Sequence, residues 1–421
     1  MRLLKKITNC WYFPWLIFGL FLRLILSPIT AHSDLWGHSF TAYFFAYEGK
    51  FNIYDYLINL PQSHPLVRNF GVGDIFIYPP LTYFTLGIFR FLVKPFTDSN
   101  FIPWLMENIN QAYFYPKIYS HIFFFKFPYI FLDILLAFLL SSLLEKESQK
   151  KLTFLFWMFN PIALYTTFMI GQIDILPVFF VVLSLFLIKN KKINWAMFSL
   201  GVGGSYKLFP LLLIFPTAFK LEEGIKKRIK LILIGFFPFI LSIFPYLFSK
   251  GFRSMVLFSP KSQKMLFMNW ALSGAESIYP FIFILIFLYF YAFYYKNSGR
   301  LIGYYISILL LIFSVTHYHP QWFLWITPFL ILELVENNFK HIWLVLTLFS
   351  CWLFITLTFE ASLSYGLFVP IFPHLKNASS LADFLSRWFN VFQLKSLVRS
   401  VFAGTALFYS WVILKEKNAE E

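Results

Sequence analysis

Long apolar runs recur along the whole chain and are separated by short polar or charged segments. The first run, residues 11–29, is close to the roughly 20 residues that a helix needs to cross a bilayer. Because lipid leaves backbone groups without partners, such runs predict membrane-spanning helices. We number the runs as spans 1–12, and they cover residues 11–29, 122–144, 152–170, 175–188, 193–219 (two spans), 231–248, 278–295, 301–316, 322–332, 341–359 and 396–414.

Residues 193–219 decide the predicted topology. This run is long for one span and short for two, and it is interrupted around Gly203 and Pro210. Lys and Arg gather on both of its flanks, and cytoplasmic loops carry the Lys/Arg excess of membrane proteins. We therefore expect a short helical hairpin with Lys207 at its outer tip and both chain termini in the cytoplasm.

The resulting prediction is a single integral membrane domain, residues 1–421, built as an all-α polytopic bundle of about 12 transmembrane helices. Two long segments then lie outside the cell, residues 30–121 as a large first extracytoplasmic loop and residues 360–395 as a late one. Within the first loop, residues 81–93 are too short for a span and follow two prolines, so we expect a surface helix there.

Composition supports this class of protein. Hydrophobic residues make up 59% of the chain and charged residues 13%, whereas a soluble domain carries roughly 25% charge. The formal charge of +15 gives no reason to expect nucleic acid, because its distribution fits membrane topology and contact with anionic lipid. The two cysteines, one before span 1 and one inside span 11, predict no disulfide.

Asp34 is the first candidate functional residue. It follows span 1 directly, lies between His32 and His38, and is one helical turn from His38. A carboxylate at the edge of the hydrocarbon region indicates a functional site, since ionisable groups are costly there. The structural alternative is a helix cap in a solvated loop, because Asp is a favoured cap residue.

Further polar side chains fall on the same predicted side of the membrane. They are Tyr78 in the first loop, Gln172 and Asp174 between spans 3 and 4, Lys207 at the hairpin tip, His317 and His319 after span 9, and Lys126 with Asp133 in span 2. Each has a structural alternative: an interfacial aromatic or histidine, a helix cap, a snorkelling lysine, or an ion pair inside the bundle. Their shared side is what favours a common site.

The chemistry that such a set suggests is glycosyl transfer from a lipid-linked sugar phosphate. Asp34 would accept the proton of an acceptor hydroxyl as general base. Lys207, with His317 or His319, would bind the departing phosphate. The lipid tail would remain in the bilayer, and a single displacement would invert the anomeric carbon.

Several short motifs occur in a fixed order up to about residue 335. They are Asp34 after span 1, YPPL at 78–81, Lys126 and Asp133 in span 2, Asn160-Pro161, GQID at 171–174, SYKLFP at 205–210 and HPQW at 319–322. This order resembles the GT-C superfamily of glycosyltransferases that use polyprenyl-phosphate sugars, and within it the bacterial alpha-mannosyltransferase and GPI-mannosyltransferase (PIG-M-like) branch.

The resemblance implies a catalytic acid in the first outer loop, here Asp34, and a polyprenyl-phosphate-linked donor, commonly of mannose or glucose. The acceptor would be a glycan, lipid or glycolipid, and the enzyme would work at the outer face of a bacterial cell membrane. Some relatives carry a DxD-like pair in this loop, whereas this chain has one acid, so we expect no metal and no other cofactor. His38, Tyr78, Lys126, Asp133, Gln172 and Asp174 would support the site or bind substrate, with Asp174 as the candidate second carboxylate.

Rival interpretations fit less well. A transporter or flippase of lipid-linked sugars would share the bundle and the buried charges, but such proteins often show repeated halves, and we find none in the sequence. A ligase or polymerase of surface glycans usually has its large loop late in the chain, whereas the long loop here is early.

Overall fold

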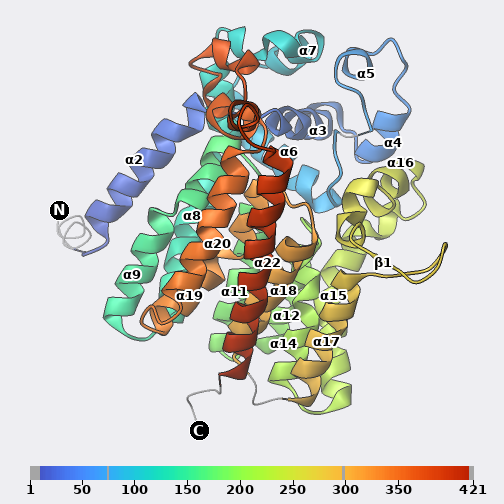
Figure 1. Cartoon of the computed structure of the whole chain (residues 1–421). Coiled ribbons are helices and arrows are strands. Elements are labelled where there is room, and N and C mark those ends of the chain that lie inside the picture. The colour runs from blue at the N-terminus through green and yellow to red at the C-terminus, as the bar shows by residue number, and fades with distance from the viewer. Residues whose placement is uncertain (1–9, 74, 296–298, 417–421) are drawn as a thin grey trace, which may run out of the picture.

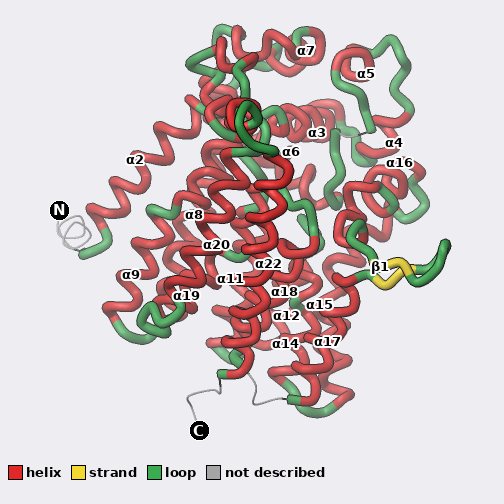
Figure 2. The backbone as a smooth tube through the Cα atoms, in the orientation of Figure 1, coloured by secondary structure: helices red, strands yellow, loops and turns green. Residues whose placement is uncertain are grey.

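The computed structural model describes residues 10–73, 75–295 and 299–416. Figures 1 and 2 show a bundle of long helices with a group of short helices over one end, at the top of the view. We call this end the α3 end. The helices of the bundle are α2 (Phe13–Ile29), α8 (Ile118–Leu143), α9 (Glu147–Met158), α11 (Ile175–Lys189), α12 (Ile193–Gly204), α14 (Ile214–Leu221), α15 (Ile225–Ile243), α17 (Pro280–Tyr294), α18 (Leu301–Val315), α19 (Thr327–Glu336), α20 (Ile342–Leu357) and α22 (Val391–Lys415).

The all-α class is confirmed, and the lengths of the helices limit what can be said of the spans. Within the described residues, four helical segments are long and apolar enough to cross a membrane, and a fifth results if α2 and the helix after it count as one bent span. Five further apolar helices are shorter. The segments that the sequence predicts as spans are thus helical, while the count of 12 crossings stays a prediction.

The short helices at the α3 end fill the predicted first loop. They are α3 (Asp34–Glu48), α4 (Ile53–Ile58), α5 (Pro65–Asn69), α6 (Pro80–Leu92) and α7 (Phe101–Glu107), and α16 (Lys250–Phe252) joins them from a later loop. They bury an apolar core of their own, rich in aromatic rings such as Tyr54 and Phe76. The hydroxyl groups of Tyr83 and Tyr246 both donate to the carbonyl oxygen of Phe51, which ties the late loop to the early one.

The expected helical hairpin at residues 193–219 is present. α12 ends at Gly204, a turn of four residues contains Lys207, and the chain returns through α13 (Phe209–Leu212) and α14. Pro210 lies in the first turn of α13, where the missing amide hydrogen costs no helical bond. The turn lies at the α3 end, because the hydroxyl of Thr82 in α6 donates to the carbonyl of Tyr206.

The remaining elements are short. They are α10 (Pro161–Ala163), α21 (Leu381–Leu385) and two antiparallel strands, β1 (Trp270–Ala271) and β2 (Ser277–Ile278), which pair Trp270 with Ile278. Residues 360–395 contain short 3₁₀ helices and α21 and lie beside α7 at the α3 end (Figure 1). Predicted span 8 begins later than expected, at Pro280, because residues 270–278 form the strand pair.

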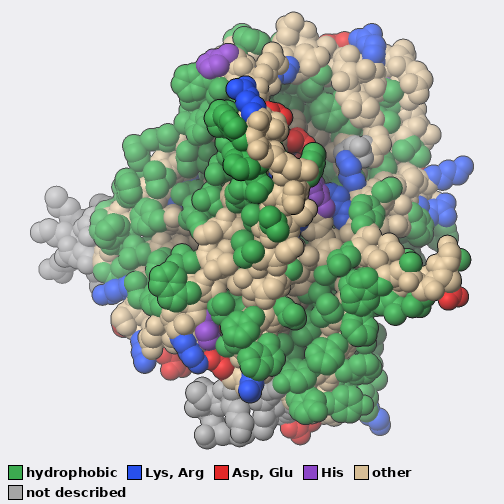
Figure 3. Space-filling model, in the orientation of Figure 1, with side chains coloured by type: hydrophobic (Ala, Val, Ile, Leu, Met, Phe, Trp, Pro, Cys, Tyr) green, Lys and Arg blue, Asp and Glu red, His purple; other side chains and the backbone are tan. Residues whose placement is uncertain are grey.

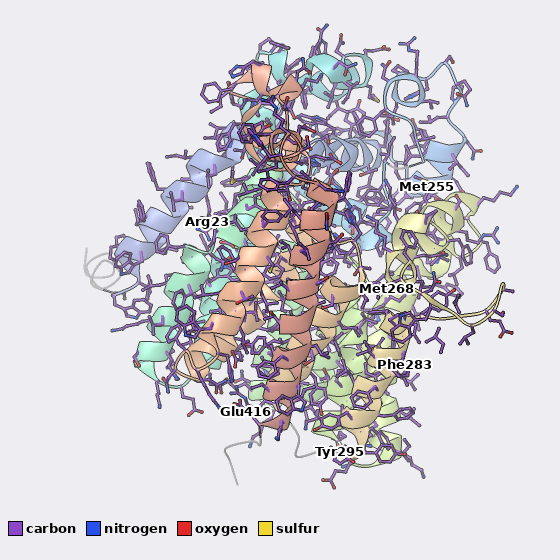
Figure 4. The ribbon with its side chains drawn as sticks, in the orientation of Figure 1. Arg23, Met255, Met268, Phe283, Tyr295 and Glu416 are labelled. Carbon is purple, nitrogen blue, oxygen red and sulfur yellow. The ribbon has the colours of Figure 1, made fainter. Side chains whose placement is uncertain are left out.

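A buried ion pair joins three helices near the start of the bundle. The guanidinium of Arg23 in α2 donates to the carboxylate of Asp133 in α8 at 2.6 Å and to the carbonyl of Met158 in α9 at 2.9 Å. The indole of Trp157 donates to the other carboxylate oxygen of Asp133 at 3.1 Å. A charge inside the bundle is tolerated only with such partners. Arg23 is labelled in Figure 4.

Candidate functional site

Asp34 opens helix α3 at a sharp corner of the chain. α2 and α3 meet at 86°, so Asp34 lies at the positive N-terminal end of α3, where a carboxylate is favoured. Its side chain is 43% exposed and accepts a hydrogen bond of 2.5 Å from the amide of Gln172. The Nδ1 atom of His32 lies 3.4 Å from the other carboxylate oxygen.

A glycine sets the position of Gln172. The π-helical turn Leu164–Ile170 ends at Gly171, whose φ of +86° is a conformation that side chains disfavour. A Cβ atom at this position would lie 2.5 Å from the side chain of Leu35 and 2.9 Å from that of Lys126. Gly171 therefore lets the chain pass close to α3 and brings Gln172 against Asp34.

Lys126 stabilises the same corner between α2 and α3 through hydrogen bonds to backbone carbonyls. Its ammonium is fully buried and donates to the carbonyls of Thr30 at 2.6 Å, Phe168 at 2.8 Å, Met169 at 3.0 Å and Ser27 at 3.1 Å. These carbonyls belong to the end of α2 and the end of the π-helical turn. Lys126 thus ties together the two segments that carry Asp34 and Gln172.

The structure corrects the expected relation of Lys126 and Asp133. They lie on one side of α8, but they do not form a pair: Lys126 is bonded to backbone carbonyls and Asp133 to Arg23 and Trp157. Asp133 is fully buried two helical turns deeper. Asp133 contacts Arg23 and Trp157 inside the bundle. Within the described part of the chain it makes no hydrogen bond or ion pair with the side chains around Asp34.

Lys207 and Asp174 form the second half of the site. The ammonium of Lys207 lies 2.7 Å from the carboxylate of Asp174, which also accepts a hydrogen bond from the indole of Trp325. The same ammonium lies over the rings of Tyr78 at 5.2 Å and Trp325 at 5.3 Å. Since Asp174 is fully buried between two donors, it serves to hold Lys207 and Trp325 in place.

His38 and Tyr78 connect the two halves. Their rings are 5.2 Å apart, and His38 interacts electrostatically with both Asp34 and Lys207. Both ring nitrogens of His38 and the Oε1 atom of Gln172 are buried, and a side-chain hydrogen-bond interaction with Gln172 acts on His38. Burial, opposed by the charge of Asp34, lowers the pKa of His38 to about 4, so this imidazole is neutral at pH 7.

His319 and Lys264 bound the site on its other side. The Nε2 atom of His319 is 2.9 Å from the ammonium of Lys264, which also lies over the ring of Trp322 at 5.7 Å. Trp322 stacks on Trp325 with ring centres 4.8 Å apart. Burial and the neighbouring lysines lower the pKa of His319 to about 4. The positive charge on this side therefore comes from lysine.

His317 lies at the rim of the site rather than inside it. Its ring is exposed, stacks on Phe359 and lies 3.3 Å from the guanidinium of Arg399 in α22. Burial, Arg399 and Lys264 lower the pKa of His317. On the face seen in Figure 3, Lys or Arg and His side chains gather in the hollow between the short helices and the bundle.

The electrostatics of Asp34 favour its ionised form. Burial by itself raises the pKa of this carboxyl, but the hydrogen bond and charge of His32, with smaller contributions from His38 and His319, hold it well below its ordinary value. At neutral pH the site thus contains the accessible carboxylate of Asp34, and Asp34, Lys207 and Lys264 all interact electrostatically with His319. Within the described residues, no three His, Cys, Asp or Glu side chains gather as a candidate metal site.

Sequence reasoning missed three members of this site. Lys264 lies in a loop that carries no recognisable motif, and Arg399 falls inside a predicted span. Trp325 is only three residues beyond the HPQW motif, and that short spacing is the one signal that pointed to it. Stacking of Trp322, Trp325 and Phe209 forms an aromatic wall behind Lys207.

Comparison with known proteins agrees with a membrane glycosyltransferase. The family model of glycosyltransferase family 87 matches residues 115–252, about a third of the chain. The match includes Gln172, Asp174 and Lys207 and ends before His319. No curated protein and no solved structure matches the chain. The family match supports glycosyltransferase activity in a helical membrane protein, and it names neither donor nor acceptor.

Proposed function

We propose that the protein transfers a hexose, with mannose favoured, from a polyprenyl-phosphate donor to an acceptor hydroxyl on a glycan, lipid or glycolipid. The observation that carries this proposal is the convergence of one accessible carboxylate and two lysines from distant parts of the chain. Asp34 comes from α3, Lys207 from the α12–α13 turn and Lys264 from the 3₁₀ helix Pro260–Leu266 that precedes β1.

The reaction is a single displacement at the anomeric carbon. An acceptor oxygen forms a bond to this carbon while the bond to the donor phosphate oxygen breaks, and the electron pair leaves with the phosphate. Asp34 takes the proton of the acceptor hydroxyl. The displacement inverts the configuration of the sugar.

The lysines act on the leaving group. Ammonium groups stabilise charge that develops on a departing phosphate, and the effect is larger where water is excluded. Lys207 has an 11% exposed side chain, and both Tyr78 and Trp325 cover it. Asp174 keeps Lys207 oriented, so this arrangement supports a positioning role for Asp174 in place of a second catalytic carboxylate.

His38, Gln172 and Tyr78 are proposed to line the sugar subsite. The imidazole of His38 interacts with the side chain of Gln172, and the buried polar atoms that these two residues do not use on each other can bind sugar hydroxyls. His319 is proposed to act as a neutral hydrogen-bonding partner of the phosphate beside Lys264.

The location of the reaction follows from the charge bias of the loops. The site lies at the end of the bundle that the Lys/Arg distribution assigns to the outer side of a bacterial cell membrane. A polyprenyl-linked donor suits this placement, because its tail can remain in the lipid while the phosphate reaches the site.

The test is a transfer assay of the purified protein with a panel of polyprenyl-phosphate sugars. We expect Asp34→Asn to lower kcat by about 10²–10⁴-fold, the range for loss of a general base. Asparagine keeps the shape of the side chain and an oxygen for the amide of Gln172, so folding should be retained. Glu48→Gln, at the exposed far end of the same helix, is the matched control. Normal turnover by Asp34→Asn would remove Asp34 from the role of base.

A further inference from the structure

An apolar groove lies on the side of the bundle formed by α17, α18 and α22. Its volume is about 590 Å³, within the range of sites that hold small organic ligands. α18 packs against both α17 and α22, which lie beside it in Figure 1. We call the lining residues of α18 the floor of the groove. The lining of the groove is mostly apolar and includes Phe287, Leu310, Leu311, Ala406 and Leu407.

Small side chains on α22 keep the groove open. Ala403, Ala406 and Ser410 recur at spacings of three and four residues and therefore share one face of the helix. On the floor, the hydroxyls of Ser307 and Ser314 donate to carbonyls of their own helix, at Gly303 and Leu310. The floor thus requires no polar ligand and suits hydrocarbon.

The groove runs along the direction in which a lipid tail lies. From Ala403 to Lys415 it follows α22 for about 18 Å at the rise of an α-helix. This is more than half of the roughly 30 Å thickness of the hydrocarbon region. Figure 4 labels Met268 near one end of this stretch and Glu416 at the other.

Basic side chains surround the end of the groove that faces the candidate site. Arg399, one helical turn before Ala403, donates to the carbonyl of Thr316, which directly follows the last floor residue, Val315. Lys264, Lys395 and Arg399 all interact electrostatically with His317. Met268 lies four residues after Lys264, whose ammonium contacts His319. A phosphate bound among these cations therefore has the apolar groove directly beneath it.

We infer that this groove binds the polyisoprenoid tail of the lipid-linked donor, with its phosphate held by Lys264, Arg399 and the lysine of the hairpin tip. This inference rests on the proposed function, because it assigns the tail of the same donor. The continuity of the cationic rim with the groove favours an anionic amphiphile over a neutral one, and the floor suits its hydrocarbon tail because the hydroxyls of Ser307 and Ser314 are already bonded within α18.

The binding test uses a polyprenyl monophosphate that carries a photoreactive group on its tail. Irradiation of the purified protein, digestion and mass spectrometry locate the attachment. We expect attachment to peptides of α18 and α22, suppressed by unlabelled polyprenyl phosphate and not by an equal amount of phosphatidylglycerol. Attachment elsewhere would overturn the assignment, and so would equal suppression by phosphatidylglycerol, which would make the groove a general lipid site.

A variant that fills the groove separates this inference from the proposed function. Ala403→Trp should reduce attachment of the probe at least tenfold and raise KM for a long-chain donor. For a donor with two isoprene units, its KM should equal that of the unmodified protein. Val401→Trp, on the exposed lipid-facing side of α22, is the control for a bulky residue on this helix. Attachment in the groove without any sugar transfer would contradict the proposed function alone. Transfer with attachment elsewhere would contradict the groove alone.

Discussion

At the scale of single residues, the charge states in the site are set by neighbours far away in the sequence. His38 is buried between Asp34 and Lys207, and burial dominates, so its pKa falls to about 4. Asp34 keeps its charge because His32 bonds it and the other imidazoles lie near. A sequence shows three ionisable side chains within seven positions, but it does not show which of them carries a charge at neutral pH.

The lowered pKa of His38 makes the stability of the protein depend on pH. Unfolded His38 takes up a proton near its ordinary pKa of about 6.5, whereas folded His38 does so only near 4. The unfolded state therefore binds more protons in this window, and the free energy of unfolding should fall as the pH drops from 6.5 towards 4. The measurement is the melting temperature of the protein in detergent at a series of pH values between 7.5 and 4.5.

Two variants test whether His38 causes this pH dependence of stability. His38→Gln should reduce the pH dependence of the melting temperature and leave the part that comes from His319, whereas His374→Gln, which changes an exposed histidine, should leave the slope unchanged. An equal slope in His38→Gln and the unmodified protein would contradict the assignment.

At the scale of elements, the site is held together by the ends of helices and the turns between them. Four such segments each contribute one or two side chains: the end of α2, the π-helical turn, the α12–α13 turn and the 3₁₀ segment Pro320–Trp325. Two residues act on these segments without being placed at the substrate. Lys126 bonds to the end of α2 and to the end of the π-helical turn, and Gly171 permits the close approach of the chain to α3.

Gly171 should be intolerant of even the smallest side chain. Gly171→Ala introduces a left-handed residue at a cost of about 1–2 kcal/mol and forces contacts with Leu35 and Lys126. We expect a lower melting temperature and a loss of transfer activity, because Gln172 moves away from Asp34. Gly404→Ala in α22, where an added Cβ meets nothing within 4 Å, is the control: it should keep transfer activity and should not lower the melting temperature, since Ala favours a helix more than Gly does.

The pair of Lys207 and Asp174 allows its structural and functional roles to be separated. Lys207→Met alone leaves a buried carboxylate without its cation, and breaking such a pair costs about 3–5 kcal/mol. The double variant Lys207→Met with Asp174→Asn removes both charges and should regain most of that stability. Its binding of polyprenyl phosphate should stay weak, as measured by titration. If the double variant binds polyprenyl phosphate as tightly as the unmodified protein, Lys207 has a structural role only.

At the scale of the whole molecule, the orientation in the membrane can be tested by labelling. In a background of Cys10→Ser and Cys351→Ala, we expect Ser273→Cys, next to the loop of Lys264, to react with an impermeant maleimide in intact cells. Lys226→Cys, in the first turn of α15 at the opposite end of the bundle, should react only after permeabilisation. Both positions are exposed in the structure. The reverse pattern would place the candidate site in the cytoplasm.

Much of the architecture could be predicted from the apolar pattern. The helical class, the hairpin around Lys207 and the group of short helices after residue 30 all follow from run lengths, prolines and the distribution of Lys and Arg. The candidate site was predictable only in part. Some of its residues stand out as polar positions at the ends of apolar runs, namely Asp34, Gln172, Asp174, Lys207 and His319. By contrast, Lys264 and Arg399 resemble ordinary loop and interface residues.

By itself, the sequence determined where the chain enters and leaves an apolar environment, because the cost of burying polar groups is a local property of each run. It could not determine which polar groups meet, since that depends on how helix ends distant in the chain are brought together. Only the tertiary structure paired Asp133 with Arg23 instead of Lys126, and Asp174 with Lys207. It also left the carboxylate of Asp34 accessible beside Gln172, because the corner between α2 and α3 and the close approach at Gly171 exist only in the folded bundle.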